Sequence, residues 1–538
     1  MDGIFSGFFP KPIKAASLPA TGVGNRQTTA FPVMELNHIA VIDFGSQYTQ
    51  LIVRRIRELG FFSRLYQPRE LHQTGKPAAV ILSGGPRSVN DVDAPDIDLD
   101  YLRTLNVPVL GVCYGMQLLS LKAGGTVASS NTREYGPAQL MICGGETLFN
   151  GVSQASQIWM SHSDTVTHLP EGASVIGKNQ DGVQVALQFS PTWFGIQFHP
   201  EVSHSPEGTQ ILRNFLALAP NAERFEIESF KKMLIQKIHD YVGEREVVCG
   251  VSGGVDSTVL AVLLKESGVK HRAIFVDTGL LRKNEAEEVQ EQFRELGVHL
   301  ETVDAADQFL SALAGEGDPE KKRKIIGNLF IDIFWKTAEN VDILAQGTLY
   351  PDVIESATSG SMASKIKTHH NRVDRIMDLK KEGRVLEPLD ELFKDEVRAL
   401  GRSMGIPDRL LNRHPFPGPG LAVRCPGEVT EEKLAIIREG DAIYMQLLRE
   451  SGWYDKVWQA YCGLIPVKTV GVKGDERSYE FAVNLRAVTS EDAMTADWAK
   501  LPYELLGRIS NEILNKVKGV NRVLYDISTK PPASIEWE

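Results

Sequence analysis

Cys113, His199 and Glu201 are the residue types of a cysteine nucleophile, its base and a carboxylate that orients the base. Cys113 stands in Gly-Val-Cys-Tyr-Gly, between an apolar run and a helical pattern, which is the form of a nucleophile elbow with cysteine in place of serine. Such a turn exposes the sulfur at a helix N-terminus, where the helix dipole favours negative charge. His199 and Glu201 are two residues apart at the end of a predicted strand, so their side chains lie on the same side. The spacing therefore predicts nucleophilic catalysis by Cys113, with His199 as its base and Glu201 behind the imidazole.

An oxyanion formed beside Cys113 needs hydrogen-bond donors. The backbone N–H of Tyr114 follows the sulfur directly, and Gly84 and Gly85 end a neighbouring predicted strand in Ser-Gly-Gly-Pro. We expect Gly84, Gly85 and Tyr114 to form the oxyanion hole. His162 is an alternative base, but the run Trp-Met-Ser-His-Ser-Asp around it is more typical of a loop near the substrate entrance.

A second stretch, Ser-Gly-Gly-Val-Asp-Ser at 252–257, has the composition of a phosphate-binding loop. It follows a predicted buried strand (247–251) and precedes a predicted helix (258–264), so glycines and free N–H groups at a helix N-terminus face one point. The carboxylate of Asp256 would repel phosphate unless it holds a magnesium ion that the phosphates also bind. No GxxxxGK[ST] sequence occurs, so this is not a Walker loop. The predicted ATP- and pyrophosphate-binding residues are Ser252, Gly253, Gly254, Val255, Asp256, Ser257 and Thr258, with Asp256 also the predicted Mg²⁺ ligand.

The elements that must position these residues alternate between strands and helices. Such alternation predicts two α/β domains with parallel sheets, whose chemistry lies at the carboxyl ends of the strands. The remaining chain predicts a small α+β unit, in which we expect helices at 431–448 and 497–518. The predicted strands are 38–44, 78–82, 107–112, 193–199, 247–251, 271–279, 299–303 and 342–348, followed by 466–473, 479–488 and 521–527 in the last unit.

We predict domains over 38–223, 224–413 and 414–538, with the rigid loop His-Pro-Phe-Pro-Gly-Pro-Gly opening the last. Residues 1–37 are rich in Gly, Pro, Thr and Ala. They are interpreted as a disordered extension or as the product of a start placed before Met34, since their apolar run is too short for a signal peptide.

Composition excludes several classes of protein. The chain has 538 residues, 24% of them charged, and a net charge of -11, which argues against a general nucleic-acid-binding protein. Its five cysteines are scattered without disulfide or zinc spacing, as in a reducing cytosol. Because no apolar run reaches the length of a membrane span, we expect a cytoplasmic protein without a membrane partner.

The motifs Ser-Gly-Gly-Pro (83–86), Gly-Val-Cys-Tyr-Gly-Met-Gln (111–117) and Phe-His-Pro-Glu (198–201), in this order and spacing, resemble those of the class I glutamine amidotransferases. The resemblance covers about 38–222. It implies that Cys113 attacks the side-chain amide of glutamine, that His199 and Glu201 assist, and that ammonia is released. The loop at 252–257 resembles the pyrophosphate loop of the N-type ATP pyrophosphatases, which adenylate a substrate oxygen.

Further motifs resemble the family of glutamine-hydrolysing GMP synthetases, and the resemblance covers about 38–538. They are FVDTGLLR, KRKIIG, AQGTLYPDVIES, IKTHHN, ELFKDEVR, RHPFPGPGL and the C-terminal KPPASIEWE. The resemblance implies that ATP, with Mg²⁺, adenylates the C2 oxygen of xanthosine 5′-monophosphate (XMP), and that ammonia displaces AMP to give GMP. It also implies a homodimer formed through the last domain, and XMP contacts from Arg323, Lys530, Ile535 and Glu536. One departure is Arg-Val-Asp-Arg-Ile-Met-Asp-Leu at 372–379, where many bacterial members have a glycine-rich stretch.

Other interpretations remain open at this point. A cation cluster such as Lys-Lys-Arg-Lys at 321–324 is most often a solvated face, although Arg323 could also bind an anion. A glutamine-dependent NAD synthetase would pair the same two activities, but the cysteine elbow and the C-terminal KPPASIEWE argue against it. A non-catalytic nucleotide-binding protein would have a damaged triad or phosphate loop, and both are intact.

Overall fold

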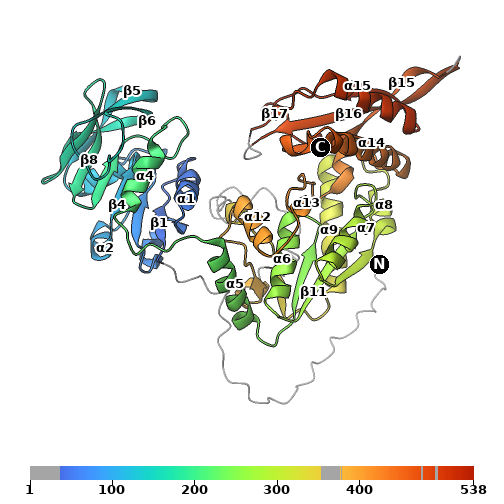
Figure 1. Ribbon diagram of the computed structural model, residues 1–538, viewed down its shortest axis with the longest axis horizontal. Coiled ribbons are helices and arrows are strands. Elements are labelled where there is room, and N and C mark those ends of the chain that lie inside the picture. The colour runs from blue at the N-terminus through green and yellow to red at the C-terminus, as the bar shows by residue number, and fades with distance from the viewer. Residues whose placement is uncertain (1–36, 353–375, 377, 474–475, 491–494) are drawn as a thin grey trace, which may run out of the picture.

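The computed structural model describes residues 37–352, 376, 378–473, 476–490 and 495–538, which form three sheets in chain order (Figure 1). The N-terminal extension up to residue 36 and most of the departure at 372–379 lie outside the described residues. Among the described helices, none is both long and apolar enough to cross a membrane.

The first sheet has nine strands in the order β2-β1-β3-β4-β9-β8-β7-β5-β6. The half from β2 to β9 is parallel, as predicted, because its central strands are buried on both faces and are continuously apolar. The other half is antiparallel and was not predicted. The strands are β1 Ile39–Ile42, β2 Ser63–Tyr66, β3 Ala79–Leu82, β4 Val109–Val112, β5 Thr126–Ile142, β6 Ala155–His168, β7 Ser174–Asn179, β8 Gln184–Ser190 and β9 Trp193–Ile196. The helices are α1 Thr49–Glu58, α2 Leu99–Thr104, α3 Tyr114–Lys122 and α4 Gly208–Leu216, with a 3-10 turn η1 at Pro68–Gln73.

The second sheet is wholly parallel, with the strand order β12-β11-β10-β13-β14, and this confirms the prediction. Its middle strand β10 leads into the 252–257 loop, so the loop lies at the centre of the carboxyl edge. The strands are β10 Val247–Val251, β11 His271–Asp277, β12 Leu300–Asp304, β13 Ile343–Ala345 and β14 Val385–Leu386. The helices are α5 Ile227–Val242, α6 Val255–Glu266, α7 Glu285–Glu295, α8 Ala306–Leu313, α9 Pro319–Thr337, α12 Lys394–Ser403 and α13 Asp408–Leu411.

The third sheet belongs to the predicted α+β unit at the C-terminus. The helix predicted from residue 497 begins only at Tyr503, because Asp497 and Trp498 pair with β16 and Pro502 precedes the helix. The strands are β15 Gln459–Lys473, β16 Glu476–Thr489, β17 Asp497–Trp498 and β18 Val520–Tyr525, and the helices are α14 Glu431–Glu450 and α15 Tyr503–Lys516, with 3-10 turns η4 Gly420–Arg424 and η5 Tyr454–Lys456.

The three units are packed against one another in different ways. One buried apolar cluster runs without a break from Ile274 of β11 to Ile437 and Tyr444 of α14, so the second and third units share a core. The first unit contacts the second through the buried Arg57 of α1, which donates to the carbonyl of Glu391 and pairs with Glu396 of α12, each at 2.6 Å. The guanidinium lies over four aromatic rings, those of Phe62, Phe225, Tyr350 and Phe393.

Candidate active sites

Cys113 occupies a strained turn between β4 and α3. Its φ of 51° is positive, which costs a residue with a side chain roughly 1–3 kcal/mol and is typical of functional sites. The glycines on either side are required by packing. A Cβ on Gly111 would lie 2.6 Å from the carbonyl carbon of Gly115, and a Cβ on Gly115 would lie 2.4 Å from the carbonyl oxygen of Leu82. The predicted nucleophile elbow is therefore present in the backbone.

His199 and Glu201 lie beside the cysteine as a buried pair. The Nδ1 atom of His199 is 2.7 Å from Oε1 of Glu201, and both side chains are almost fully buried. Burial by itself would lower the pKa of His199, but the charge of Glu201 and hydrogen bonds to Cys113 and Glu201 raise it well above 6.5. The geometry thus stabilises an imidazolium, which is what a base becomes after it takes the thiol proton. Strand β9 ends at Ile196, so the pair lies in the turn beyond it and not on the predicted strand.

The predicted oxyanion-hole residues surround the same sulfur. Tyr114 is the first residue of α3, where a helix offers its N–H no internal acceptor. A Cβ on Gly84 would lie 3.0 Å from Cε1 of His199, and one on Gly85 would lie 3.1 Å from Cγ of Tyr114. Only glycine leaves this space open, and which of these N–H groups bind the oxyanion stays a prediction.

A cavity of about 330 Å³ opens onto Cys113 and His199, and it contains two charged residues that the sequence interpretation missed. Among the described residues that line it, Asp164 supplies a carboxylate and Arg87 a guanidinium. Asp164 is buried, accepts a hydrogen bond from the hydroxyl of Ser88, and is tied through its carbonyl to the side-chain amide of Gln117 at 2.8 Å. The cavity therefore offers one charge of each sign to an amino acid.

His162 lies in the same cavity, but on strand β6 and not on the predicted loop. Its Nδ1 is 2.9 Å from the carbonyl oxygen of Asp164, and burial lowers its pKa to about 4. The imidazole is therefore neutral at neutral pH. We infer from this hydrogen bond that His162 holds the backbone of Asp164 in place. His199 therefore remains the candidate base.

The second candidate site is the turn from β10 into α6. The hydroxyl of Thr258 donates to the carbonyl of Gly254 at 2.8 Å, and the backbone N–H of Ser252 donates to Oγ of Ser257 at 3.2 Å. Gly253 has a φ of +72°, and a Cβ there would lie 2.6 Å from Cγ2 of Val289. The helix begins at Val255, three residues earlier than predicted, so Asp256 is in its first turn. The strand–loop–helix arrangement is confirmed.

Asp256 has a partner that the sequence interpretation did not identify. The ammonium group of Lys394, the first residue of α12, lies 2.6 Å from Oδ1 and 2.5 Å from Oδ2 of Asp256. Within the described ranges there is no group of three or more metal-ligating side chains. Asp256 thus offers a single, partly exposed carboxylate, which suits Mg²⁺ that arrives with nucleotide phosphates, because that ion keeps waters and needs few protein ligands.

The four predicted XMP-contacting residues lie in different settings. Arg323 is exposed on α9 and pairs with Glu320 of the same helix. The backbone of Lys530 forms an isolated antiparallel β-bridge with Ala496. The carbonyl of the buried Ile535 accepts a hydrogen bond from the hydroxyl of Tyr461 at 2.9 Å. Glu536 accepts from the buried Arg424 at 2.9 Å and from Gln459 at 2.7 Å.

The solvated-face interpretation of the 321–324 cluster misses Lys322. This side chain is fully buried, and its ammonium group donates to the carbonyls of Ala422, Cys425 and Gly427, each at 3.0 Å. It also pairs with the carboxylate of Glu538. Lys322 therefore anchors the C-terminal loop, residues 526–538, and lies next to the exposed Arg323.

Three family descriptions match the chain in the order of its sheets. Residues 40–219 match "Glutamine amidotransferase class-I", 226–331 match "NAD synthase" and 446–537 match "GMP synthase C terminal domain". Curated relatives are similar over nearly their whole length. A GMP synthase (glutamine-hydrolyzing) of Thermosipho africanus is 50% identical over 94% of this chain and 100% of its own. Those of Thermosipho melanesiensis and of Nitratidesulfovibrio vulgaris strain Miyazaki F are 49% and 51% identical, each over 93% of this chain and 99% of their own.

Proposed function

The chain belongs to the family of glutamine-hydrolysing GMP synthases, and from this premise we propose which of its residues carry each part of the reaction. It is a C–N ligase that makes GMP from XMP with glutamine as nitrogen donor and ATP as co-substrate. We assign the amidotransferase to 38–223, the ATP pyrophosphatase to 224–413, and dimerisation and part of XMP binding to 414–538. The observation that carries the assignment is a cysteine elbow with a buried His–Glu pair beside one sheet and a glycine-rich strand–loop–helix turn at the carboxyl edge of the next.

In the first domain Cys113 attacks the side-chain amide carbon of glutamine. Its proton passes to His199, and the tetrahedral oxyanion is held by N–H groups of Gly84, Gly85 and Tyr114. Collapse breaks the C–N bond, and the nitrogen leaves as ammonia with the proton from His199. Water then hydrolyses the thioester, releasing glutamate and restoring the thiol. Asp164 and Arg87 are suited to bind the α-ammonium and α-carboxylate of glutamine.

In the second domain the loop from Ser252 to Thr258 holds the phosphates of ATP through its N–H groups and hydroxyls. Asp256 is the proposed ligand of Mg²⁺, and Lys394 is a cation beside it that neutralises the carboxylate when ATP is not bound. Magnesium bound there would offset the charge that builds on the departing pyrophosphate.

In the third domain we propose that Glu536 accepts a purine N–H of XMP and that Lys530 binds its phosphate, together with Arg323 of the second domain. Support comes from how firmly the C-terminal loop is held. Arg424 and Gln459 orient the carboxylate of Glu536, and the buried Arg486 donates to the carbonyls of Ser528, Ser534 and Ile535. Ile535 fills the apolar cluster beneath the loop.

Two sites in one chain fit the chemistry of ammonia. At neutral pH free ammonia is mostly ammonium, which is not a nucleophile, so ammonia made on the protein and kept from water stays reactive. We place the enzyme in the cytoplasm, a reducing compartment in which its five free cysteines are stable.

The assignment of the second domain as an ATP pyrophosphatase is tested by identifying the products that the enzyme forms from ATP. With XMP, magnesium and an ammonium salt, we expect AMP and pyrophosphate in amounts equal to GMP. ADP with phosphate would instead indicate phosphorylation and would contradict an adenylating site. If AMP forms with nicotinic acid adenine dinucleotide and not with XMP, the substrate is that of an NAD synthetase and the assignment of XMP is wrong.

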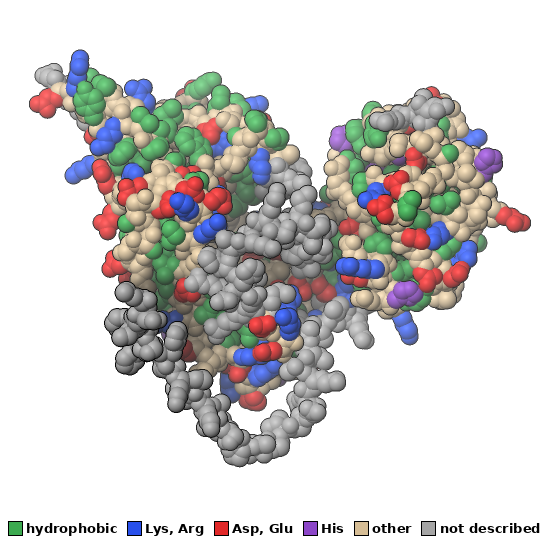
Figure 2. Space-filling view, turned by 180° about the vertical axis from the view of Figure 1, so that it is seen from behind, with side chains coloured by type: hydrophobic (Ala, Val, Ile, Leu, Met, Phe, Trp, Pro, Cys, Tyr) green, Lys and Arg blue, Asp and Glu red, His purple; other side chains and the backbone are tan. Residues whose placement is uncertain are grey.

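The C-terminal unit carries an apolar hairpin that its own chain leaves exposed, and we propose that it packs against a second copy. Strand β15 is at the edge of its sheet, and Val470 pairs with Tyr479 of β16. Val467, Val470, Val472 and Tyr479 are all more than half exposed. Figure 2 shows hydrophobic side chains gathered over this unit, and Figure 1 shows the hairpin projecting from it. An exposed apolar edge of this kind marks an interface between proteins.

Val470→Asp is expected to weaken dimerisation by at least roughly tenfold, because it places a charge in the apolar contact. Sedimentation velocity over a range of concentrations measures this. Val92→Asp, at an exposed apolar residue of the first domain, is the matched control and should leave the dimer intact. A monomeric wild-type chain, or a Val470→Asp variant that dimerises normally, would contradict the proposal.

A further inference from the structure

We propose that Arg413 is a positioning residue of the ATP loop. This proposal rests on the assignment of residues 252–258 as the loop that binds ATP. Arg413 precedes the proline-rich segment that leads into the third domain. One guanidinium nitrogen, Nη1, donates to the carbonyl oxygen of Gly253 at 3.0 Å, and Nη2 pairs with Oε1 of Glu285 at 2.6 Å. The contact reaches the backbone of the loop from the side of α7, across 160 residues of sequence.

The bond to Gly253 fixes the direction of a particular N–H group. The peptide between Gly253 and Gly254 is planar and trans, so its carbonyl and its N–H point in opposite directions. Because Arg413 holds the carbonyl on the α7 side, the N–H of Gly254 is directed to the hollow of the loop, where it donates to Oγ of Ser252 at 3.3 Å. A phosphate oxygen in that hollow would accept from the same N–H. Gly253 has no Cβ and a positive φ, so without an external hold its peptide is free to rotate.

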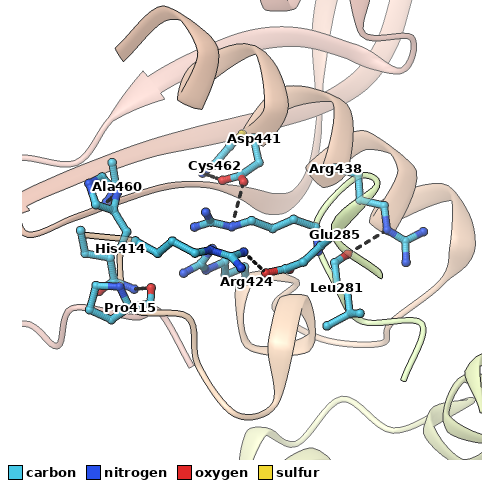
Figure 3. Close-up of polar contacts among 12 residues, drawn as sticks. Leu281, Glu285, His414, Pro415, Arg424, Arg438, Asp441, Ala460 and Cys462 are labelled. Atoms are coloured by element: carbon cyan, nitrogen blue, oxygen red, sulfur yellow. Dashed lines mark hydrogen bonds and ion pairs between the residues drawn. The ribbon is translucent and has the colours of Figure 1, made fainter. Parts of the chain in front are cut away.

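Arg413 is itself held rigidly by both domains. Its salt bridge with Glu285 is largely buried, and Glu285 also accepts a hydrogen bond from the backbone N–H of Arg282 at 3.0 Å. The next two residues are fixed to the third domain, as Figure 3 shows for His414 and Pro415. His414 bonds to the carbonyl of Tyr454 at 2.8 Å and to the N–H of Ala460 at 3.3 Å, and Gln459 donates to the carbonyl of Pro415 at 3.1 Å.

The chemistry of the contact requires arginine. A planar guanidinium presents two N–H groups in a fixed fork, so it can bond a carbonyl and a carboxylate at once, whereas an ammonium group cannot hold both in that geometry. Glu285 neutralises the positive charge. Arg413 therefore acts through the orientation of the Gly253 peptide and not as a phosphate-binding cation.

The test compares Arg413→Gln with Arg409→Gln in steady-state GMP synthesis, with ammonium salt as nitrogen source so that the amidotransferase is bypassed. Arg409 and Arg413 both line a groove beside α7, and Arg409 pairs there with Glu295 of α7 in an exposed salt bridge, so Arg409 serves as the matched control. We expect the KM for ATP to rise at least roughly tenfold in Arg413→Gln and to stay unchanged in Arg409→Gln. The KM for XMP and the release of glutamate from glutamine should remain near wild type, which a general loss of folding would not allow.

Arg413→Lys should give an intermediate KM for ATP, and it keeps the proposal testable if the glutamine variant does not fold. Ser257→Ala separates this inference from the loop assignment. If Ser257→Ala raises the KM for ATP and neither Arg413 variant does, Arg413 has no positioning role and the loop assignment stands. If none of these variants changes the KM for ATP, the assignment of the loop fails as well.

Discussion

Cys113→Ala is expected to abolish GMP formation from glutamine while GMP formation from ammonium salts continues at the wild-type rate. Cys113 supplies the only nucleophile in the buried triad, and loss of a triad nucleophile typically costs roughly 10⁴-fold or more in rate. The second domain needs only ammonia, XMP and ATP, and its phosphate loop lies on a different sheet from the cysteine. Parallel assays of GMP with glutamine and with ammonium chloride measure the two effects.

Cys143→Ala provides the control for Cys113, because Cys143 is an exposed cysteine in the same domain, beyond β5. It should behave as wild type with both nitrogen sources. Equal losses of synthesis with glutamine and with ammonium in Cys113→Ala would contradict the division of the reaction between two sites.

Asp256→Asn is expected to abolish GMP synthesis with either nitrogen source, by roughly 10²–10³-fold or more. The amide keeps the size of the side chain but removes the charge that would hold Mg²⁺ and that now pairs with Lys394. Formation of AMP should fall with formation of GMP, because the step that is lost is transfer of the adenylyl group. The measurement is AMP and GMP by chromatography at saturating ATP and XMP.

Two controls distinguish loss of the adenylylation step from a general loss of activity in Asp256→Asn. The variant should still release glutamate from glutamine, since that chemistry belongs to the first sheet. Asp240→Asn, at an exposed carboxylate of α5, should leave synthesis unchanged. Formation of AMP at the wild-type rate in Asp256→Asn would refute the role assigned to this carboxylate.

What could be predicted from the sequence was local. The elbow at Cys113, the His199–Glu201 pair and the loop at 252–257 are each set by a few neighbouring residues, and the structure has the predicted turns. The parallel strands were also predictable, because burial on both faces makes them continuously apolar. Among the antiparallel strands, β6 buries every second residue, but its buried positions include the polar His162 and Asp164, so the sequence does not alternate apolar with polar residues. The pairings of β5 with β6 and of β7 with β8 also shift in register.

The residues that were missed act across long separations in the chain. Lys394 reaches Asp256 over 138 residues, and Arg413 reaches Gly253 over 160. Asp164 was visible in the sequence, but its place in the cavity beside Cys113 depends on the pairing of β6 with β5. The 321–324 cluster shows the same limit, because only the packing of α9 against the C-terminal loop distinguishes the buried Lys322 from the exposed Arg323.

Supply of ammonia from the Cys113 site to the Asp256 site is tested most directly by following the amide nitrogen of glutamine. The wild-type enzyme would be given XMP, ATP, magnesium and amide-¹⁵N glutamine, with a low concentration of unlabelled ammonium in the buffer. We expect GMP labelled with ¹⁵N, together with one AMP and one glutamate for each GMP. Glutamate formed without ¹⁵N in GMP, or ATP that stays intact while glutamine is consumed, would contradict a single enzyme in which the Cys113 site supplies the Asp256 site.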